Sequence, residues 1–189
     1  MPKRLFAFAI CIFIALAVVA LWLGRESRAP AQSSEKSGAQ PNEIAASTGA
    51  VYTAKFPDLQ GKSQTLGQWD RKLLVLNFWA TWCGPCKEEI PILAKLQAKF
   101  GERGLQIVGI AADSALNVTN FSENTAINYP LLVDEAGALQ LSKRLGNRLG
   151  LLPHTVMFSP GGDIIYTKLG IISEAELDPI ISQNSPTKP

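Results

Sequence analysis

The stretch LLVLNFWATWCGPC, residues 73–86, decides the fold. Its first half, residues 73–80, is an almost unbroken apolar run, which is typical of a strand buried on both faces of a sheet. Its second half places Cys83 and Cys86 two residues apart, where a helical pattern begins. A central parallel strand that leads directly into a cysteine pair and a helix predicts an α/β domain with a site at the end of that strand.

Strand-like and helix-like segments alternate on either side of this stretch. Before it, the residues leading to Gly61 and residues 62–66 predict a short hairpin. After it, an apolar stripe predicts a helix over residues 84–100, which Pro91 should kink. Further strands are predicted at residues 105–111, 131–133, 155–159 and 163–169, and further helices at 114–126, 138–145 and from Ser173, where Glu176 completes a capping box. This order predicts a mixed central sheet with helices on both faces.

The composition limits the chain to one domain with an appendage. Its 189 residues are 47% hydrophobic and 18% charged, which is too apolar for a disordered chain and typical of a buried core. The net charge of +2 comes from Lys3 and Arg4, so the rest of the chain is electrically balanced, which argues against nucleic acid as a partner. With 3 cysteines and 1 histidine, and with Cys11 inside an apolar run, a structural Cys/His zinc site is excluded.

Residues 1–23 are predicted to form a transmembrane anchor or a signal segment. After Lys3 and Arg4, residues 5–23 are apolar and carry no charge, which is long enough for a helix to span a bilayer. We favour an uncleaved anchor, because this run is longer than that of a usual signal peptide and the nearby small-x-small site, residues 29–31, has a proline in its middle. The flanking charges favour an N-terminus on the inner side of the membrane.

Residues 24–50 are predicted to be a flexible linker. They are rich in Ser, Ala, Gln, Gly and Pro and have no apolar periodicity. As a random coil, such a segment spans on the order of 30 Å. We therefore expect a folded domain, residues 51–189, that is held near a membrane and is free to turn toward its partners.

The cysteine pair has the properties that thiol–disulfide exchange needs. Cys83 would lie at a helix N-terminus, where unpaired backbone N–H groups and the helix dipole stabilise a thiolate, so Cys83 is predicted to be the nucleophile. Cys86, one turn further along, can attack the resulting mixed disulfide and is predicted to be the resolving thiol. Pro85 is compatible with the first helical turn because no backbone N–H is needed there.

Two polar residues near the pair are candidates for a supporting role. Glu89 lies on the apolar stripe of the predicted helix, whereas Glu88 points away from the stripe. Burial would raise the pKa of Glu89, so we expect it to take the proton of Cys86; the alternative is an exposed helix charge paired with a lysine. Asn77 is the single polar residue of its strand and is predicted to be a hydrogen-bonded core residue that does not titrate.

These residues resemble the thioredoxin superfamily, and more closely its membrane-tethered TlpA/ResA-like and cytochrome c maturation branch. The resemblance covers about residues 51–182. It rests on NFWATWCGPC at residues 77–86, on Glu89 and Pro91, and on LPHT at residues 152–155. It implies a thioredoxin-like fold with an added N-terminal hairpin and a central insertion.

The resemblance also implies a client-binding surface around the cysteine pair. Pro153 is expected to be a cis proline beside the disulfide, which exposes the backbone of Leu152 to an extended segment of the client. Trp82 is expected to form part of the platform, together with Gly84 and Pro85.

Family resemblance further indicates the direction of the reaction. Cytoplasmic thioredoxins carry an acid at the position of Asn77, whereas this chain, like the tethered branch, places it at Glu89. The Gly84-Pro85 dipeptide matches that of reducing thioredoxins, whose reduction potentials are about −270 mV, so we expect a reductase of protein disulfides. The resemblance implies the bacterial inner membrane with the domain in the periplasm, a membrane thiol relay as electron donor, and no cofactor besides the dithiol.

Three other functions are open at this point. Two thiolates could hold Cu(I) in a metallochaperone, with His154 as a third ligand; otherwise His154 would be an exposed or substrate-facing loop residue. A peroxide-reducing relative would need partners around its thiol that Thr81 alone does not supply. A module that only binds partners is disfavoured by the intact pair. The client, for example an apocytochrome c or a disulfide isomerase, is left open because exchange chemistry is indifferent to the chain that bears the disulfide.

Overall fold

A computed structural model of the chain describes residues 49 and 51–185. The predicted anchor, residues 1–23, and nearly all of the predicted linker, residues 24–50, lie outside this part. Among the described residues, no helix is both long enough and apolar enough to cross a membrane.

The core of the domain is a five-stranded mixed sheet. Its strands are β3 (Leu73–Trp79), β4 (Leu105–Ala111), β5 (Leu131–Val133), β6 (His154–Phe158) and β7 (Ile164–Leu169), in the order β5-β4-β3-β6-β7. The first three strands are parallel, whereas β6 runs antiparallel to β3 and β7 antiparallel to β6. The predicted mixed sheet is confirmed.

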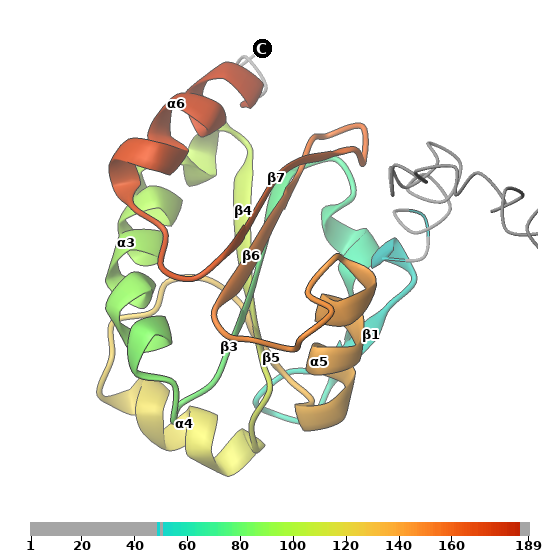
Figure 1. The fold of residues 1–189 in the computed structure, drawn as a ribbon, viewed down its shortest axis with the longest axis vertical. Coiled ribbons are helices and arrows are strands. Elements are labelled where there is room, and N and C mark those ends of the chain that lie inside the picture. The colour runs from blue at the N-terminus through green and yellow to red at the C-terminus, as the bar shows by residue number, and fades with distance from the viewer. Residues whose placement is uncertain (1–48, 50, 186–189) are drawn as a thin grey trace, which may run out of the picture. The chain divides into compact units, whose positions relative to one another are not determined.

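Helices cover both faces of this sheet, as predicted (Figure 1). One face packs against α3 (Gly84–Phe100), α4 (Ala115–Glu123) and α6 (Glu174–Asn184). The other face packs against α5 (Glu135–Arg144) and the N-terminal hairpin of β1 (Lys55–Pro57) and β2 (Ser63–Thr65). The domain also contains two short 3-10 helices, η1 (Leu66–Trp69) and η2 (Gly101–Arg103).

The central strand β3 is buried on both faces along its whole length. Because side chains alternate along a strand, Val75 and Trp79 pack in the core beneath α3, whereas Leu76 and Phe78 pack in the core beneath α5. Two separate cores therefore meet at β3. The odd-numbered residues of β3 face the helix that carries the cysteine pair.

The helix α3 begins at the cysteine pair and runs through Pro91 without a break. Cys83 is its N-cap residue and Pro85 lies in its first turn, where a missing N–H costs nothing. The stripe of Ile90, Leu93, Leu96 and Phe100 is buried, as the sequence predicts. The cysteine pair is therefore held at the end of a long helix that is anchored in the core.

Helix ends follow local capping rather than apolar periodicity. Helix α5 begins at Glu135, three residues before the predicted start, because the Asp134 carboxylate accepts a hydrogen bond from the Gly137 N–H at 2.8 Å. At α6, Ser173 caps the helix by accepting from the Glu176 N–H at 3.3 Å. The predicted capping box is only half formed, because the Glu176 carboxylate bonds Tyr166 and Lys168 instead.

The N-terminal hairpin closes one edge of the sheet. β1 and β2 pair antiparallel, as predicted, and a single bridge joins Asp58 to Leu132 of the edge strand β5. The hairpin is held together at its tip because the Asp58 carboxylate accepts from the Gln60 and Lys62 backbone N–H groups.

Candidate active site

Cys83 and Cys86 form a disulfide at the start of α3, with an S–S distance of 2.07 Å. Cys86 is fully buried, whereas Cys83 is 6% exposed and follows Trp82, which is 69% exposed. Cys83 is therefore the cysteine of the pair that keeps some exposure, although both are classed with the buried core. The roles of Cys83 as nucleophile and of Cys86 as resolving thiol stay predictions.

The helix terminus is suited to a sulfur anion at Cys83. The Cys83 Sγ accepts a hydrogen bond from the Cys86 backbone N–H at 3.3 Å. Among the described residues of the first turn there is no acidic side chain that would oppose a negative charge. Unpaired N–H groups and the helix dipole both favour a thiolate here, which lowers the energy of the attacking form.

Glu89 is fully buried one turn beyond Cys86. Its Oε1 accepts from Asn77 Nδ2 at 2.5 Å, and its Oε2 accepts from the Ile172 backbone N–H at 3.3 Å. Burial raises the pKa of Glu89 to about 7, although these two hydrogen bonds and the charge of Lys168 act in the opposite direction. An acid with this pKa can exchange a proton at neutral pH.

Asn77 is a hydrogen-bonded core residue, as predicted. Besides Glu89, its Nδ2 donates to Thr155 Oγ1 at 3.1 Å. The sequence did not predict a role for Thr155. That role follows from the register of the two strands, because Thr155 of β6 pairs with Asn77 of β3 and the two side chains therefore point to the same face of the sheet.

The Leu152–Pro153 peptide bond is cis, which confirms the expectation from the resemblance. Pro153 is buried and its carbonyl accepts from the Gly170 N–H at 2.9 Å. Gly170 has a φ of 95°, a conformation that residues with a Cβ rarely adopt, so a glycine is needed beside this proline. Leu152 is half-buried at the rim.

Both expectations for His154, a third copper ligand and an exposed or substrate-facing loop residue, were wrong. His154 is 1% exposed, and its ring stacks on Phe78 with centroids 5.6 Å apart. Its Nδ1 and Nε2 lie 2.9 Å from Ser142 Oγ and 3.2 Å from Thr167 Oγ1. The reason is the strand register: His154 pairs with Phe78 and faces α5, whereas the next residue faces the cysteine pair.

This placement removes the proposed third copper ligand. The imidazole of His154 is on the face of the sheet opposite α3, and both of its nitrogens already have partners. Within residues 51–185, no group of three or more His, Cys, Asp or Glu side chains could hold a metal ion.

Exposed apolar side chains gather on the loops at one end of the sheet. The strand pairings Trp79 with Ala111 and His154 with Leu169 show that β3, β4 and β7 end, and β6 begins, at this edge. The strand ends, loops and helix starts at this edge carry the exposed large apolar residues of the described chain: Trp82, Leu116, Leu149, Leu151, Leu169 and Ile171. The disulfide lies at the same end of the sheet, directly after the exposed Trp82.

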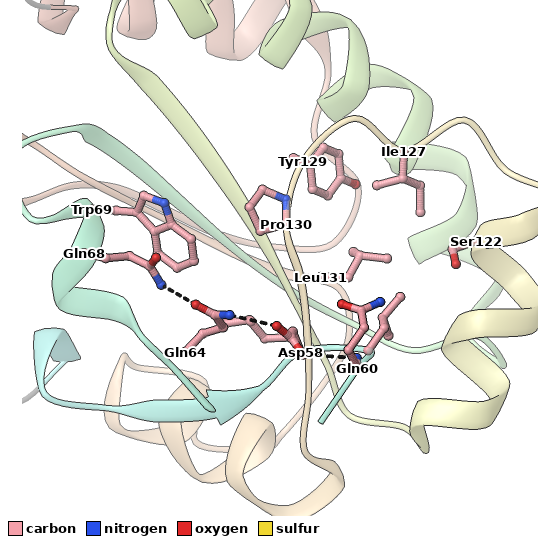
Figure 2. Close-up of a pocket in the computed structure, with 12 residues that line it drawn as sticks. Asp58, Gln60, Gln64, Gln68, Trp69, Ser122, Ile127, Tyr129, Pro130 and Leu131 are labelled. Carbon is pink, nitrogen blue, oxygen red and sulfur yellow. Dashed lines mark hydrogen bonds between the residues drawn. The ribbon is translucent and has the colours of Figure 1, made fainter. Parts of the chain in front are cut away.

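A cavity of about 600 Å³ lies elsewhere, between the N-terminal hairpin and residues 127–132 (Figure 2). One wall is a chain of hydrogen bonds from Gln68 to Gln64 at 3.2 Å and from Gln64 to Asp58 at 2.7 Å. No predicted site residue lines it. The cavity is distinct from the redox site.

The fold and the Cys83–Cys86 disulfide at the start of α3 define a thiol-disulfide oxidoreductase of the thioredoxin-like class. The chain belongs to the Redoxin family, whose profile matches residues 29–181. It is 30% identical over 130 residues to the thiol-disulfide oxidoreductase ResA of Bacillus thuringiensis subsp. konkukian, a match that covers 68% of this chain and 73% of the relative.

Solved structures agree with this assignment. A thioredoxin-related protein from Neisseria meningitidis serogroup B is 32% identical, with a TM-score of 0.60, over 68% of this chain and 97% of that one. A thiol:disulfide interchange protein from Chlorobium tepidum TLS is 26% identical, with a TM-score of 0.62, over 69% of this chain and 92% of that one.

Proposed function

We propose that the chain is a membrane-tethered, extracytoplasmic reductase of protein disulfides. The observation that carries this proposal is the order of burial along α3: Cys83 keeps 6% exposure beside the exposed Trp82, whereas Cys86 and, one turn further on, Glu89 are fully buried. The sulfur that meets the client is thereby separated from the sulfur that releases it.

In the proposed reaction, the reduced chain attacks with the Cys83 thiolate. A bond forms between the Cys83 sulfur and one client sulfur, and the client S–S bond breaks, so the other client sulfur leaves as a thiolate. The Cys86 thiolate then attacks the Cys83 sulfur. The Cys83–Cys86 disulfide forms, the second client sulfur leaves, and two electrons have passed to the client.

Glu89 supplies the proton transfer that the second attack needs. Cys86 is fully buried, which disfavours its thiolate, so a nearby base must take its proton. The Glu89 carboxylate becomes a neutral acid in this step, and its burial favours the neutral form. The proton remains on Glu89 until the site opens to water or to the departing client thiolate.

The apolar surface around the disulfide is the proposed client-docking site. We assign Trp82, Gly84 and Pro85 on the α3 side, and Leu152 and Pro153 on the opposite side, to contact with the client. The exposure of Trp82 and the cis bond before Pro153 support this assignment. An extended segment of an unfolded or partly folded protein fits such a surface better than a small polar molecule does.

Residues 1–23 are proposed to anchor the chain in the bacterial inner membrane, with residues 24–50 as a linker and the domain in the periplasm. Outside the cytoplasm the oxidised pair must be reduced again by electrons from the membrane, so a membrane thiol relay is the proposed donor. Cytochrome c maturation is the client process that the family resemblance favours.

The reduction potential of the full-length chain tests the direction of transfer. Equilibration in glutathione and dithiothreitol buffers should give a reversible two-electron couple well below the roughly −120 mV of a strong oxidant. A potential near that value would make the chain a disulfide donor. Cys83→Ser is the control, because it must abolish the two-electron redox couple while leaving the hydrophobic core intact.

A further inference from the structure

The amide of Asn77 contains a buried oxygen that has no hydrogen-bond partner among residues 51–185. Its Nδ2 makes two hydrogen bonds, to Glu89 Oε1 and to Thr155 Oγ1, while Oδ1 makes none. An unpaired buried carbonyl is costly, so this orientation needs a reason.

The reason lies in the protonation state of Glu89. Both partners of the carboxyl group, Asn77 Nδ2 and the Ile172 backbone N–H, are donors, which suits an ionised carboxylate. A protonated Glu89 would need an acceptor instead. The backbone N–H of Ile172 cannot become an acceptor, so of the two groups that bond the carboxyl group only the Asn77 side chain can offer one, its Oδ1, to a proton on Oε1.

We propose that Asn77 is a positioning residue whose amide rotates by half a turn when Glu89 takes up a proton. In the rotated form, Oδ1 accepts from the protonated Oε1 of Glu89. The Thr155 hydroxyl serves both forms, because it accepts from Nδ2 in one and donates to Oδ1 in the other. Oδ1 has no partner in the first orientation and Nδ2 has none in the rotated one. The cost of one unpaired amide atom is therefore common to both forms.

Other charged and titratable groups bias Glu89 but do not replace this contact. The positive charge of Lys168 on β7 lowers the pKa of Glu89, and Lys168 is itself paired with Glu176 on α6. The negative charge of Glu89 in turn raises the pKa of Tyr129, after the larger effect of burial, and contributes to raising the pKa of Tyr166 after burial and the hydrogen bond and charge of Glu176. Within the described residues, Asn77 is the side chain that bonds the carboxyl group directly.

This inference rests on the proposed proton transfer from Cys86 to Glu89. In that step the S–H bond of Cys86 breaks and an O–H bond forms at the Glu89 carboxylate, with no change in oxidation state. A fixed donor at Oε1 would oppose the arriving proton. A rotating amide accepts it, and Glu89 can then both take up and return the proton.

Nuclear magnetic resonance on the full-length oxidised chain tests the rotation, since no thiol titrates in that form. The Glu89 carboxyl carbon, assigned with Glu89→Gln, gives the protonation midpoint. We expect the chemical shifts of the Asn77 side-chain NH₂ protons to change with the same midpoint. At low pH, the amide proton that is bonded to Glu89 should lose the downfield shift of a strong hydrogen bond. Asn77 signals that do not follow Glu89 would overturn the proposal.

A variant provides a second, independent measurement. In Asn77→Leu, the hydrogen bond is lost from both protonation states, so the midpoint of Glu89 should rise by less than about one pH unit. A rise of roughly one to two pH units is expected if Asn77 donates to the carboxylate alone, and would overturn the rotation. Asn128→Leu, which removes an exposed amide bonded to the Ala94 carbonyl, is the matched control and should leave the midpoint unchanged.

These readouts are separate from the test of function. They require no client and no turnover, so a chain with an oxidising potential would still show the rotation. Conversely, a static Asn77 amide in a chain with a low reduction potential would remove this inference and leave the proposed reductase intact.

Discussion

The two faces of the sheet each bury a titratable side chain, with opposite results. On the α3 face, burial raises the pKa of Glu89 to about 7; on the α5 face, burial lowers the pKa of His154 to about 4. Their contacts, Asn77 and Phe78, are consecutive residues of β3. The same loss of solvation brings the acid into the neutral pH range and takes the base out of it.

Under the proposed function, the difference assigns the chemistry to one face and a structural role to the other. Glu89 lies one turn beyond Cys86 on α3 and can change its charge at neutral pH. His154 stays neutral there, held between the hydroxyls of Ser142 and Thr167. Although His154 follows the cis proline directly, its side chain belongs to the structural face.

The largest expected effect comes from removing the chemistry of the α3 face. Cys83→Ser should lower the reduction of insulin disulfides by at least about a thousandfold, because the attacking sulfur is lost. Cys86→Ser should instead trap a mixed disulfide between Cys83 and the client, visible by mass spectrometry. His154→Gln should retain most of the turnover; a loss as large as that of Cys83→Ser would break the comparison between the faces.

Glu89→Gln should slow the resolving step by roughly a hundredfold near pH 7, because general acid–base assistance is lost while the shape is kept. Stopped-flow tryptophan fluorescence of mixed-disulfide decay measures this step across pH. Glu88→Gln is the matched control, since Glu88 is exposed on the same helix turn. Equal effects of the two variants would show that Glu89 acts only through the negative charge of the helix, which Glu88 shares, and not by taking up a proton.

The two buried groups should give pH dependences of stability with opposite signs. The folded-state pKa of Glu89 lies above its ordinary 4.5, so its contribution is full below that value and is lost as the pH rises to about 7, a change of about 3 kcal/mol. The folded-state pKa of His154 lies below its ordinary 6.5, so its contribution is full above 6.5 and is lost as the pH falls to about 4.

Urea unfolding of the oxidised chain between pH 4 and 8 can separate the two contributions. Glu89→Gln should leave a stability that falls more steeply toward acid than in the parent chain, and His154→Gln should leave one that falls more steeply toward base. His154 is the single histidine of the chain, so its proton resonances report its titration directly. A midpoint near 6.5 for that ring would contradict the buried, neutral histidine.

The smallest effect is expected at the surface. Lys95 pairs with Glu174 at 2.6 Å, but the lysine side chain is 66% exposed. Lys95→Ala should therefore change the free energy of unfolding by less than about 0.5 kcal/mol, with little dependence on pH. A change of several kcal/mol in a denaturant titration would mean that this surface pair matters as much as the buried groups do.

The sequence allowed the central strand, the cysteine pair and the acid to be predicted, because each depends on local pattern. The apolar run of β3, the helix that starts at Cys83 and the buried stripe carrying Glu89 are all visible in spacing alone. The cis bond at Pro153 required the family resemblance, since cis and trans prolines share the same sequence.

The remaining features depend on how distant segments pair. The orientation of His154 and the role of Thr155 follow from the register of β6 against β3, which two adjacent polar residues in one strand do not reveal. The carboxylate of Glu176 does not complete the predicted capping box, because it accepts hydrogen bonds from Lys168 and Tyr166 of β7. Such competition is decided only once the sheet and α6 are assembled.

The bridge between Asp58 and Leu132 has a consequence for self-association. β5 is a short edge strand made of Leu131, Leu132 and Val133, and an open edge of this kind can recruit a strand from a neighbouring molecule. The N-terminal hairpin, held by the Asp58 side chain, occupies that edge. The hairpin thereby makes β5 less available for pairing with a second copy of the chain, so any association through the sheet would have to use the opposite edge strand, β7.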